Sequence, residues 1–145
     1  MAAGETWRKG LQSVIDEVER RGGRANESGA RGRGIHHLLI DCPSGRWRAR
    51  LKTKSSGTWQ DDTGNGTPAT ADDVDDCVWI YVDVKGEPSF FVAPAWWAVN
   101  DIQDAHAKYL ARHGGRRAVT QGTTHHAIPL ERVLQWKDRW DIIGL

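Results

Sequence analysis

The sequence predicts an α/β or α+β fold in which helices pack on a mixed central sheet of four to five strands. Three segments carry this prediction. Residues 5–21 have apolar side chains at helical spacing, residues 46–54 alternate between apolar and basic side chains, and residues 77–82 are apolar throughout. Alternation is typical of a strand with one buried face, whereas a short, fully apolar run is typical of a central strand. We therefore expect the sheet to be built around residues 77–82.

Turn residues and apolar periodicity divide the rest of the chain. In order, they predict a flexible Gly/Arg loop (22–34), a strand (35–41), a tight turn (42–45), a long acidic loop (55–76), a hairpin partner for the central strand (89–92), a helix (95–112), a short strand within 118–128 and a last helix from residue 129. The apolar C-terminal residues 142–145 are expected to dock on the body. The 145 residues fit one domain, 1–145.

The composition excludes several classes of protein. With 39% hydrophobic and 27% charged residues, the chain has the balance of a soluble globular protein. Two cysteines are too few for a disulfide scaffold and favour a reducing, cytoplasmic location. The N-terminus lacks a signal-peptide pattern, and no apolar run approaches the roughly 18 residues of a membrane span, so no membrane partner is expected. The chain is tryptophan-rich, with eight tryptophans, and we expect most of them in the core.

Opposite charges occupy neighbouring parts of the sequence. Residues 20–54 contain ten basic and two acidic side chains, whereas residues 61–76 contain six acidic and no basic ones. A basic block of this kind is typical of a protein with an anionic partner. The alternative is an acidic loop that folds back over the basic face, and the sequence does not decide between them.

The basic residues of segment 46–54 fall on one strand face. Like charges so close together need water or an anion between them. If the anion is nucleic acid, the phosphate contacts come from this strand, a tryptophan beside it stacks on a base, and basic residues after the 95–112 helix form a rim. The candidate nucleic-acid-binding residues are Arg48, Arg50, Lys54, Trp59, Arg116 and Arg117.

The segment HHLLIDCPSGRWRARLKTKSSGTW, residues 36–59, resembles the PD-(D/E)XK or restriction-endonuclease-like nuclease superfamily. Lys52 and Thr53 match the Lys-Thr end of its (E/Q)-x-K motif, and the resemblance covers roughly residues 5–112. It implies a restriction-endonuclease-like core and, in an active member, a hydrolase that cleaves phosphodiesters with Mg²⁺ or Mn²⁺.

The match to this motif is incomplete. Arg50 stands at the (E/Q) position, and the acidic position of the preceding strand falls on His37 or, in a shifted register, on Asp41. The resemblance therefore implies Asp41 and Lys52 as catalytic residues and Asp41 and His37 as metal ligands. Because Mg²⁺ prefers carboxylate oxygens and an arginine repels it, we expect weak or no cleavage. An acid from the loop, one of Asp61, Asp62, Asp72 or Asp73, could fold back toward Lys52 and restore a site.

The sequence leads to three functional hypotheses. The first is a nucleic-acid-binding protein of nuclease-like fold with a degenerate active site, which binds DNA in preference to RNA. The second is an active nuclease that depends on Mg²⁺ or Mn²⁺, and it is the only hypothesis that implies a cofactor. The third is a non-catalytic protein-interaction subunit or homodimer, since tryptophan is enriched at interface cores.

Overall fold

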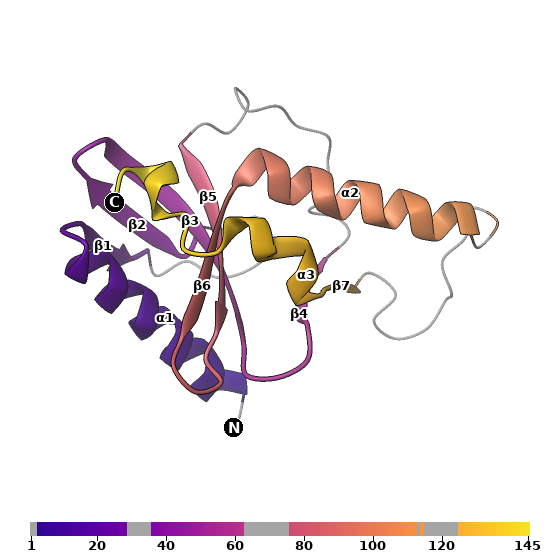
Figure 1. The fold of residues 1–145 in the computed structure, drawn as a ribbon, viewed down its shortest axis with the longest axis horizontal. Helices are drawn as coiled ribbons and strands as arrows, with labels where there is room; N and C mark the ends of the chain where they lie inside the picture. Colours follow the sequence, from indigo (N-terminus) through magenta and orange to yellow (C-terminus); the bar gives the residue numbers. More distant parts are fainter. Residues whose placement is uncertain (1–2, 29–35, 63–75, 113, 115–124) are drawn as a thin grey trace.

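The computed structural model describes residues 3–28, 36–62, 76–112, 114 and 125–145. In chain order, the elements are α1 (Ala3–Arg20), β1 (Arg24–Glu27), β2 (Leu38–Cys42), β3 (Gly45–Lys54), β4 (Trp59–Asp62), β5 (Cys77–Asp83), β6 (Ser89–Pro94), α2 (Ala95–Arg112), β7 (His125–Ile128), α3 (Leu130–Val133), and the 3₁₀ helices η2 (Leu134–Trp136) and η3 (Trp140–Ile143). Figure 1 shows α1 and α2 on either side of the strands.

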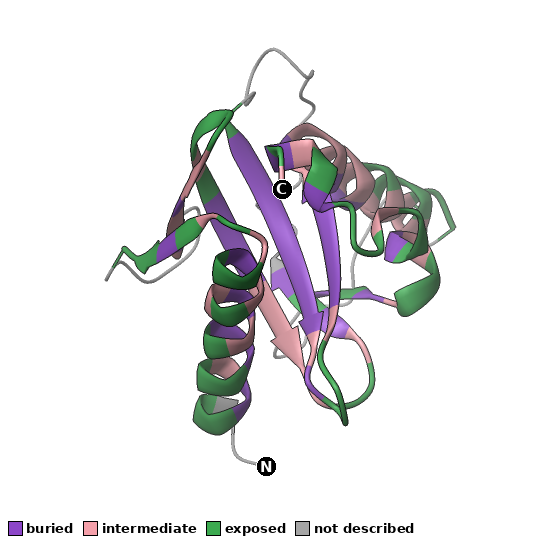
Figure 2. Cartoon of the chain, turned by 60° about the vertical axis from the view of Figure 1, so that its left-hand side comes forward, coloured by how far each residue is buried: buried purple, intermediate pink, exposed green. Residues whose placement is uncertain are grey.

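Five strands form a mixed sheet in the order β1-β2-β3-β5-β6. The pair β3–β5 is parallel, and the other three neighbouring pairs are antiparallel. The predicted fold class, a mixed sheet of four to five strands with helices packed on it, is thus confirmed. The prediction that residues 77–82 form a central strand is also correct, because β5 lies between β3 and β6 and is buried along most of its length (Figure 2).

The side chains of β5 serve two separate cores. Val78, Ile80 and Val82 pack with α1, whereas Trp79 and Tyr81 pack with α2. Because successive strand residues point to opposite faces, this alternation places the two helices on opposite sides of the sheet. The two-sided apolarity of the sequence is therefore explained by a helix on each face.

Helix α1 lies unusually close to β3. A side chain at Gly10 would overlap Thr53 Cγ2, so the absence of a Cβ lets the helix approach the sheet there. Leu11, Val14 and Val18 are buried on the same helical face. The predicted amphipathic helix over residues 5–21 is confirmed.

The C-terminal segment docks as predicted. Trp140 and Ile143 are fully buried in the α1-side core, and the Ser44 hydroxyl donates a hydrogen bond of 2.7 Å to the Ile143 carbonyl. The C-terminus is thereby attached to the turn between β2 and β3.

Two segments predicted as loops contain strands. Residues 24–27 of the Gly/Arg loop form β1, and residues 59–62 of the acidic loop form β4, which pairs with β7 in a separate two-stranded sheet. Both strands have only four residues, too few for a readable alternation. Residues 29–35 and 63–75 lie outside the described residues, as do Arg116 and Arg117. No helix among the described residues is long and apolar enough to cross a membrane.

Candidate nucleic-acid interface

Each of the five basic side chains on one face of β3 lies near a carboxylate. The nitrogen–oxygen distances are 2.7 Å for Arg46–Asp41, 2.8 Å for Arg48–Asp76, 3.9 Å for Arg50–Asp61, 3.3 Å for Lys52–Asp61 and 3.0 Å for Lys54–Asp83. Asp61 and Asp76 belong to the segment predicted as an acidic loop. The alternative in which acidic residues fold back onto the basic strand therefore applies to these two.

Accessibility divides the five cations into two groups. The side chains of Arg46 and Arg48 are 65% and 44% exposed, whereas those of Arg50, Lys52 and Lys54 are only 7%, 18% and 9% exposed. The prediction that Arg50 and Lys54 contact phosphate is therefore not supported by this structure. Burial in ion pairs with Asp61 and Asp83 keeps their charged groups from a ligand at the surface.

Trp59 is a core residue rather than a stacking platform. Its ring is 1% exposed and makes edge-to-face contacts with Tyr81 and Phe91, and its Nε1–H donates to the Val82 carbonyl at 3.0 Å. Lys54 Nζ lies 4.7 Å from the ring centroid. The expectation that Trp59 stacks on a base fails because β4 turns the ring inward, beneath Lys54.

The exposed arginines belong to two cross-strand rows. The first row is Arg24, Asp41 and Arg46, and the second is Asn26, Leu39 and Arg48, taken from β1, β2 and β3 in each case. Residues directly opposite in antiparallel strands share a face, and the alternate residues Ala25 and Ile40 point into the α1-side core. The two rows therefore lie on the face opposite α1, while α2 packs on β5 and β6. We call these six residues the arginine face.

The arginine face is accessible. Arg24, Asn26, Arg46 and Arg48 are exposed, and Leu39 and Asp41 are half-buried. Hydrogen bonding from Arg46 lowers the pKa of Asp41, with a smaller effect from Arg24. The sequence showed Arg24 only as part of a basic block, because its place in one row with Asp41 and Arg46 depends on the pairing of β1 with β2, which no pattern predicts.

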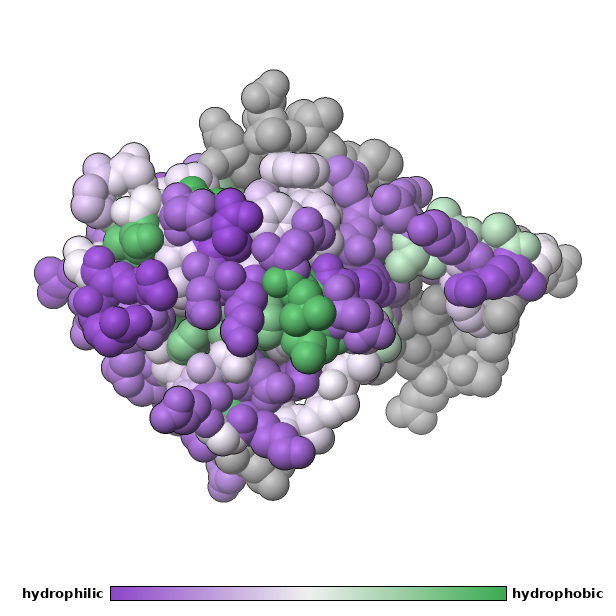
Figure 3. Space-filling view, in the orientation of Figure 1, coloured by the Kyte–Doolittle hydropathy of each residue, from purple (hydrophilic) through white to green (hydrophobic). Residues whose placement is uncertain are grey.

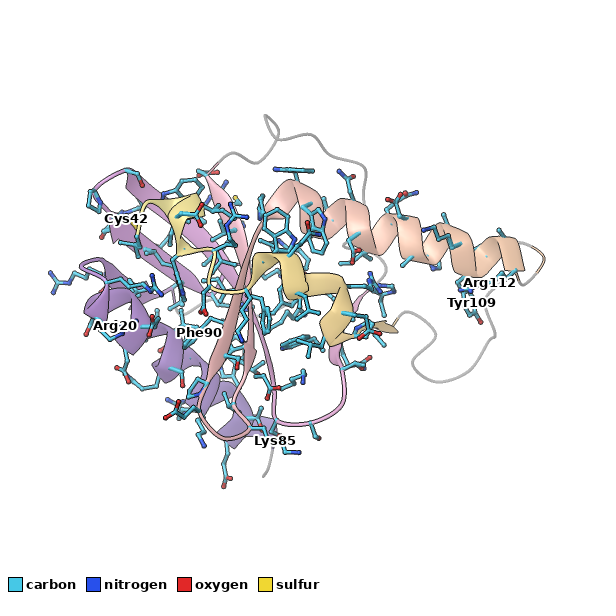
Figure 4. The ribbon with its side chains drawn as sticks, in the orientation of Figure 1. Arg20, Cys42, Lys85, Phe90, Tyr109 and Arg112 are labelled. Carbon is cyan, nitrogen blue, oxygen red and sulfur yellow. The ribbon has the colours of Figure 1, made fainter. Side chains whose placement is uncertain are left out.

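The structure does not bring Asp41 and Lys52 together. Asp41 lies opposite Arg46, six residues before Lys52 on β3, so the two are about 20 Å apart along the strand. In Figure 4, the labelled residues Cys42 and Lys85 lie at opposite ends of the sheet. Cys42 follows Asp41, and Lys85 lies just beyond Asp83, the partner of Lys54. A catalytic pair of Asp41 and Lys52 does not fit this register.

His37 is also remote from Asp41. His37 directly precedes β2 and lies four residues before Asp41, about 13 Å along the extended chain. The Leu51 backbone N–H donates to His37 Nδ1 at 2.9 Å, and the ring centroid lies 4.7 Å from that of Trp7. Nδ1 is thus an acceptor with the ring proton on Nε2. A shared metal site of His37 and Asp41 does not form here.

Asp61 is the acid that approaches Lys52. It extends from β4, which follows β3 after a short connection, and its carboxylate is 1% exposed. The prediction that a loop acid folds back toward Lys52 is confirmed for Asp61. The side chains of Asp62, Asp72 and Asp73 lie outside the described residues. Among the residues that the structure does describe, no three histidine, cysteine or acidic side chains are grouped as metal ligands would be.

A second polar cluster, which the sequence did not reveal, supports β7. Arg132 binds both carboxylate oxygens of Asp101 on α2, donates to the Ala127 carbonyl at 3.2 Å, and lies 3.0 Å from His126 Nε2. His126 is paired across the two-stranded sheet with Asp61. This cluster holds β7 in place. Because β4 pairs with β7, the cluster also supports the position of Asp61.

The fold just described is nuclease-like. Among solved structures, the chain is similar to a bacterial homing endonuclease, I-Ssp6803I, with a TM-score of 0.54 and 12% sequence identity, over 98% of this chain and 91% of that chain. At this identity, the likeness concerns the fold. No protein-family model matches the sequence, and no curated protein matches it.

Proposed function

We propose that this protein binds nucleic acid, DNA in preference to RNA, and that its phosphodiester-cleaving site is degenerate. The observation that carries the proposal is the likeness of nearly the whole chain, 98%, to a homing endonuclease. The exposed arginines on the sheet give this fold a surface for phosphate, because arginine binds phosphate through two parallel N–H donors. We also propose that the protein belongs to the PD-(D/E)XK superfamily, which residues 36–59 resemble.

Among the residues that the structure describes, those around Lys52 do not fit a magnesium ion. Asp61 is the carboxylate that approaches Lys52, and it also lies 3.9 Å from the Arg50 guanidinium. Mg²⁺ requires near-octahedral oxygen ligands, and two fixed cations beside one carboxylate oppose its entry. The expected outcome is binding without cleavage.

An active nuclease dependent on Mg²⁺ or Mn²⁺ is the second candidate. The 3.3 Å contact of Asp61 with Lys52 favours it, since an acid and a lysine are adjacent although neither Asp41 nor His37 supplies that acid. In this version Lys52 and Asp61 are both needed for cleavage, and Asp41 is not.

The third candidate, a protein-interaction subunit or homodimer, has an apolar surface to support it. Leu130 and Leu134 are 41% and 52% exposed, and Figure 3 shows an apolar area over α3 near the middle of the view. Nearby, Trp97 and Trp136 pack edge to face with centroids 5.5 Å apart. Light scattering on the purified protein tests for a dimer, which Leu130→Ser with Leu134→Ser should dissociate.

One panel separates the first two candidates. Plasmid, duplex and single-stranded oligonucleotides are incubated with the protein in Mg²⁺ or Mn²⁺ and scored for both shift and cleavage. The proposal predicts a shift with intact nucleic acid. Cleavage that disappears in both Lys52→Ala and Asp61→Asn would establish the second candidate, and the absence of any shift would refute binding.

A further inference from the structure

Three arginines on the arginine face have a backbone spacing that lets each contact a separate phosphate. Arg46 and Arg48 are two residues apart on β3, about 6.7 Å, and Arg24 lies two strands from Arg46, about 10 Å. Phosphates of one DNA strand rise about 3.4 Å each along the helix axis, and their separation in space is larger because the strand winds around the axis. Arg46 and Arg48 are therefore far enough apart to contact different phosphates of one strand. Paired strands also hold the arginines more rigidly than a loop would.

The same face lacks the groups that bind unpaired bases. None of the six residues of its two described rows is aromatic. Trp47, on the intervening residue of β3, belongs to the opposite face and packs against the α1-side core, and Trp59 is buried. Proteins that hold single strands combine basic residues with aromatic stacking platforms. The arginine face therefore matches the phosphates of a duplex better than the bases of a single strand.

Two carboxylates already accept hydrogen bonds from the N–H donors of Arg46 and Arg48 that would bind a phosphate. Asp41 accepts from Arg46 Nε at 2.7 Å and Nη2 at 3.4 Å, and Asp76 accepts from Arg48 Nε at 3.0 Å and Nη2 at 2.8 Å. These are the two-point contacts that a phosphate makes with arginine. Both pairs are substantially exposed, and exposed ion pairs are weak, so a phosphate can displace the carboxylate.

We infer that the arginine face binds the phosphate backbone of duplex nucleic acid and that Asp41 and Asp76 are internal competitors that weaken this binding. This inference rests on the proposed function and deepens it, because it specifies the surface, the class of nucleic acid and the residues that set the affinity. It predicts that neutralising the carboxylate of Asp41 or of Asp76 strengthens duplex binding.

The experiment measures the affinity of a labelled duplex and of each of its single strands by fluorescence anisotropy over a range of salt concentrations. Arg46→Gln with Arg48→Gln should weaken duplex binding and reduce the slope of log K against log salt by about 1.8, since each lost duplex contact accounts for about 0.9. Asp41→Asn and Asp76→Asn should each strengthen duplex binding by about two- to fivefold.

The exposed pair Arg139–Asp141 supplies a matched control. Its two contacts, 2.9 Å and 3.0 Å, have the same geometry, and it lies outside the arginine face. Asp141→Asn changes the net charge by the same amount as Asp41→Asn or Asp76→Asn, and Arg139→Gln changes it by half as much as the double arginine variant. Both control variants should leave affinity and slope close to those of the parent. Circular dichroism confirms that each variant is folded.

The outcomes distinguish this inference from the proposed function. A parent protein that binds neither duplex nor single strand refutes both. If the parent protein binds, three results would refute the inference and leave the proposed function standing. The first is that the single strand binds more tightly than the duplex, and the second is that the double arginine variant binds duplex like the parent. The third result is that Asp41→Asn and Asp76→Asn change the affinity no more than Asp141→Asn does.

Discussion

At the scale of single residues, cations of the same strand have different roles. Lys54 is nearly buried and holds both Asp83 and the ring of Trp59, whereas Arg46 is exposed beside Asp41. Loss of one partner of a buried pair leaves an uncompensated charge, whereas surface pairs contribute little. We predict that Lys54→Ala lowers the free energy of unfolding by about 1–3 kcal/mol. Arg46→Ala should change it by less than about 0.5 kcal/mol. Urea denaturation of both variants tests this, and equal effects would contradict the division between buried and exposed cations.

Asp76 allows a prediction about pH. Hydrogen bonds from Arg48, and then from Cys77, lower the pKa of its carboxyl from 3.8 to about 2. A carboxyl with a lowered pKa in the folded state contributes stability above its unfolded pKa and loses it as the pH falls. Asp76 should therefore contribute above pH 4 and lose that contribution between about pH 4 and 2. The effect is less than about 1 kcal/mol because the side chain is 49% exposed. The difference in unfolding free energy between parent and Asp76→Asn should shrink across this interval, and a constant difference would be inconsistent with the pair.

At the scale of elements, the contact of α1 with β3 depends on one glycine. Gly10→Ala gains helix propensity but forces its methyl group into Thr53, so we predict a net loss of about 1–3 kcal/mol in the free energy of unfolding. Gly4, in the same helix, has open space around its Cβ position, and Gly4→Ala should be neutral or stabilising by up to about 1 kcal/mol. Thermal unfolding of the two variants compares them directly. If Gly10→Ala is as stable as Gly4→Ala, the close packing of α1 is wrong.

The strands that could be predicted from the sequence have a recognisable pattern of apolar residues within their own segments. The alternation of residues 46–54 and the apolar run of 77–82 determine which face each side chain takes, because a strand has a period of two. β1 and β4 have four residues each and are held by pairing with β2 and β7, which local sequence does not encode. The alternation also placed Arg50 and Lys54 on the same face as Arg48 correctly. It could not show that β4 covers that face and buries them, because cover is decided by tertiary structure.

At the scale of the whole molecule, some residues of the candidate site can be predicted from the sequence, whereas others depend on how the strands pair. Lys52 was identified by its motif and Asp61 by its place in an acidic loop. The hairpin register, however, separates Asp41 from Lys52, and four residues of extended chain separate Asp41 from His37. The two rows of the arginine face form only when β1, β2 and β3 pair in this register. The fold thus presents exposed arginines at one end of the sheet and a buried acid–lysine contact at the other.

Binding without cleavage is tested with the parent protein and one end-labelled DNA duplex in Mg²⁺. Portions of each incubation are run on a native gel, which reports binding, and on a denaturing gel, which reports cleavage. We predict a retarded, intact duplex whose retardation weakens as salt rises, since phosphate contacts release counterions. An unretarded duplex, or cleavage products that vanish in Asp61→Asn, would contradict it.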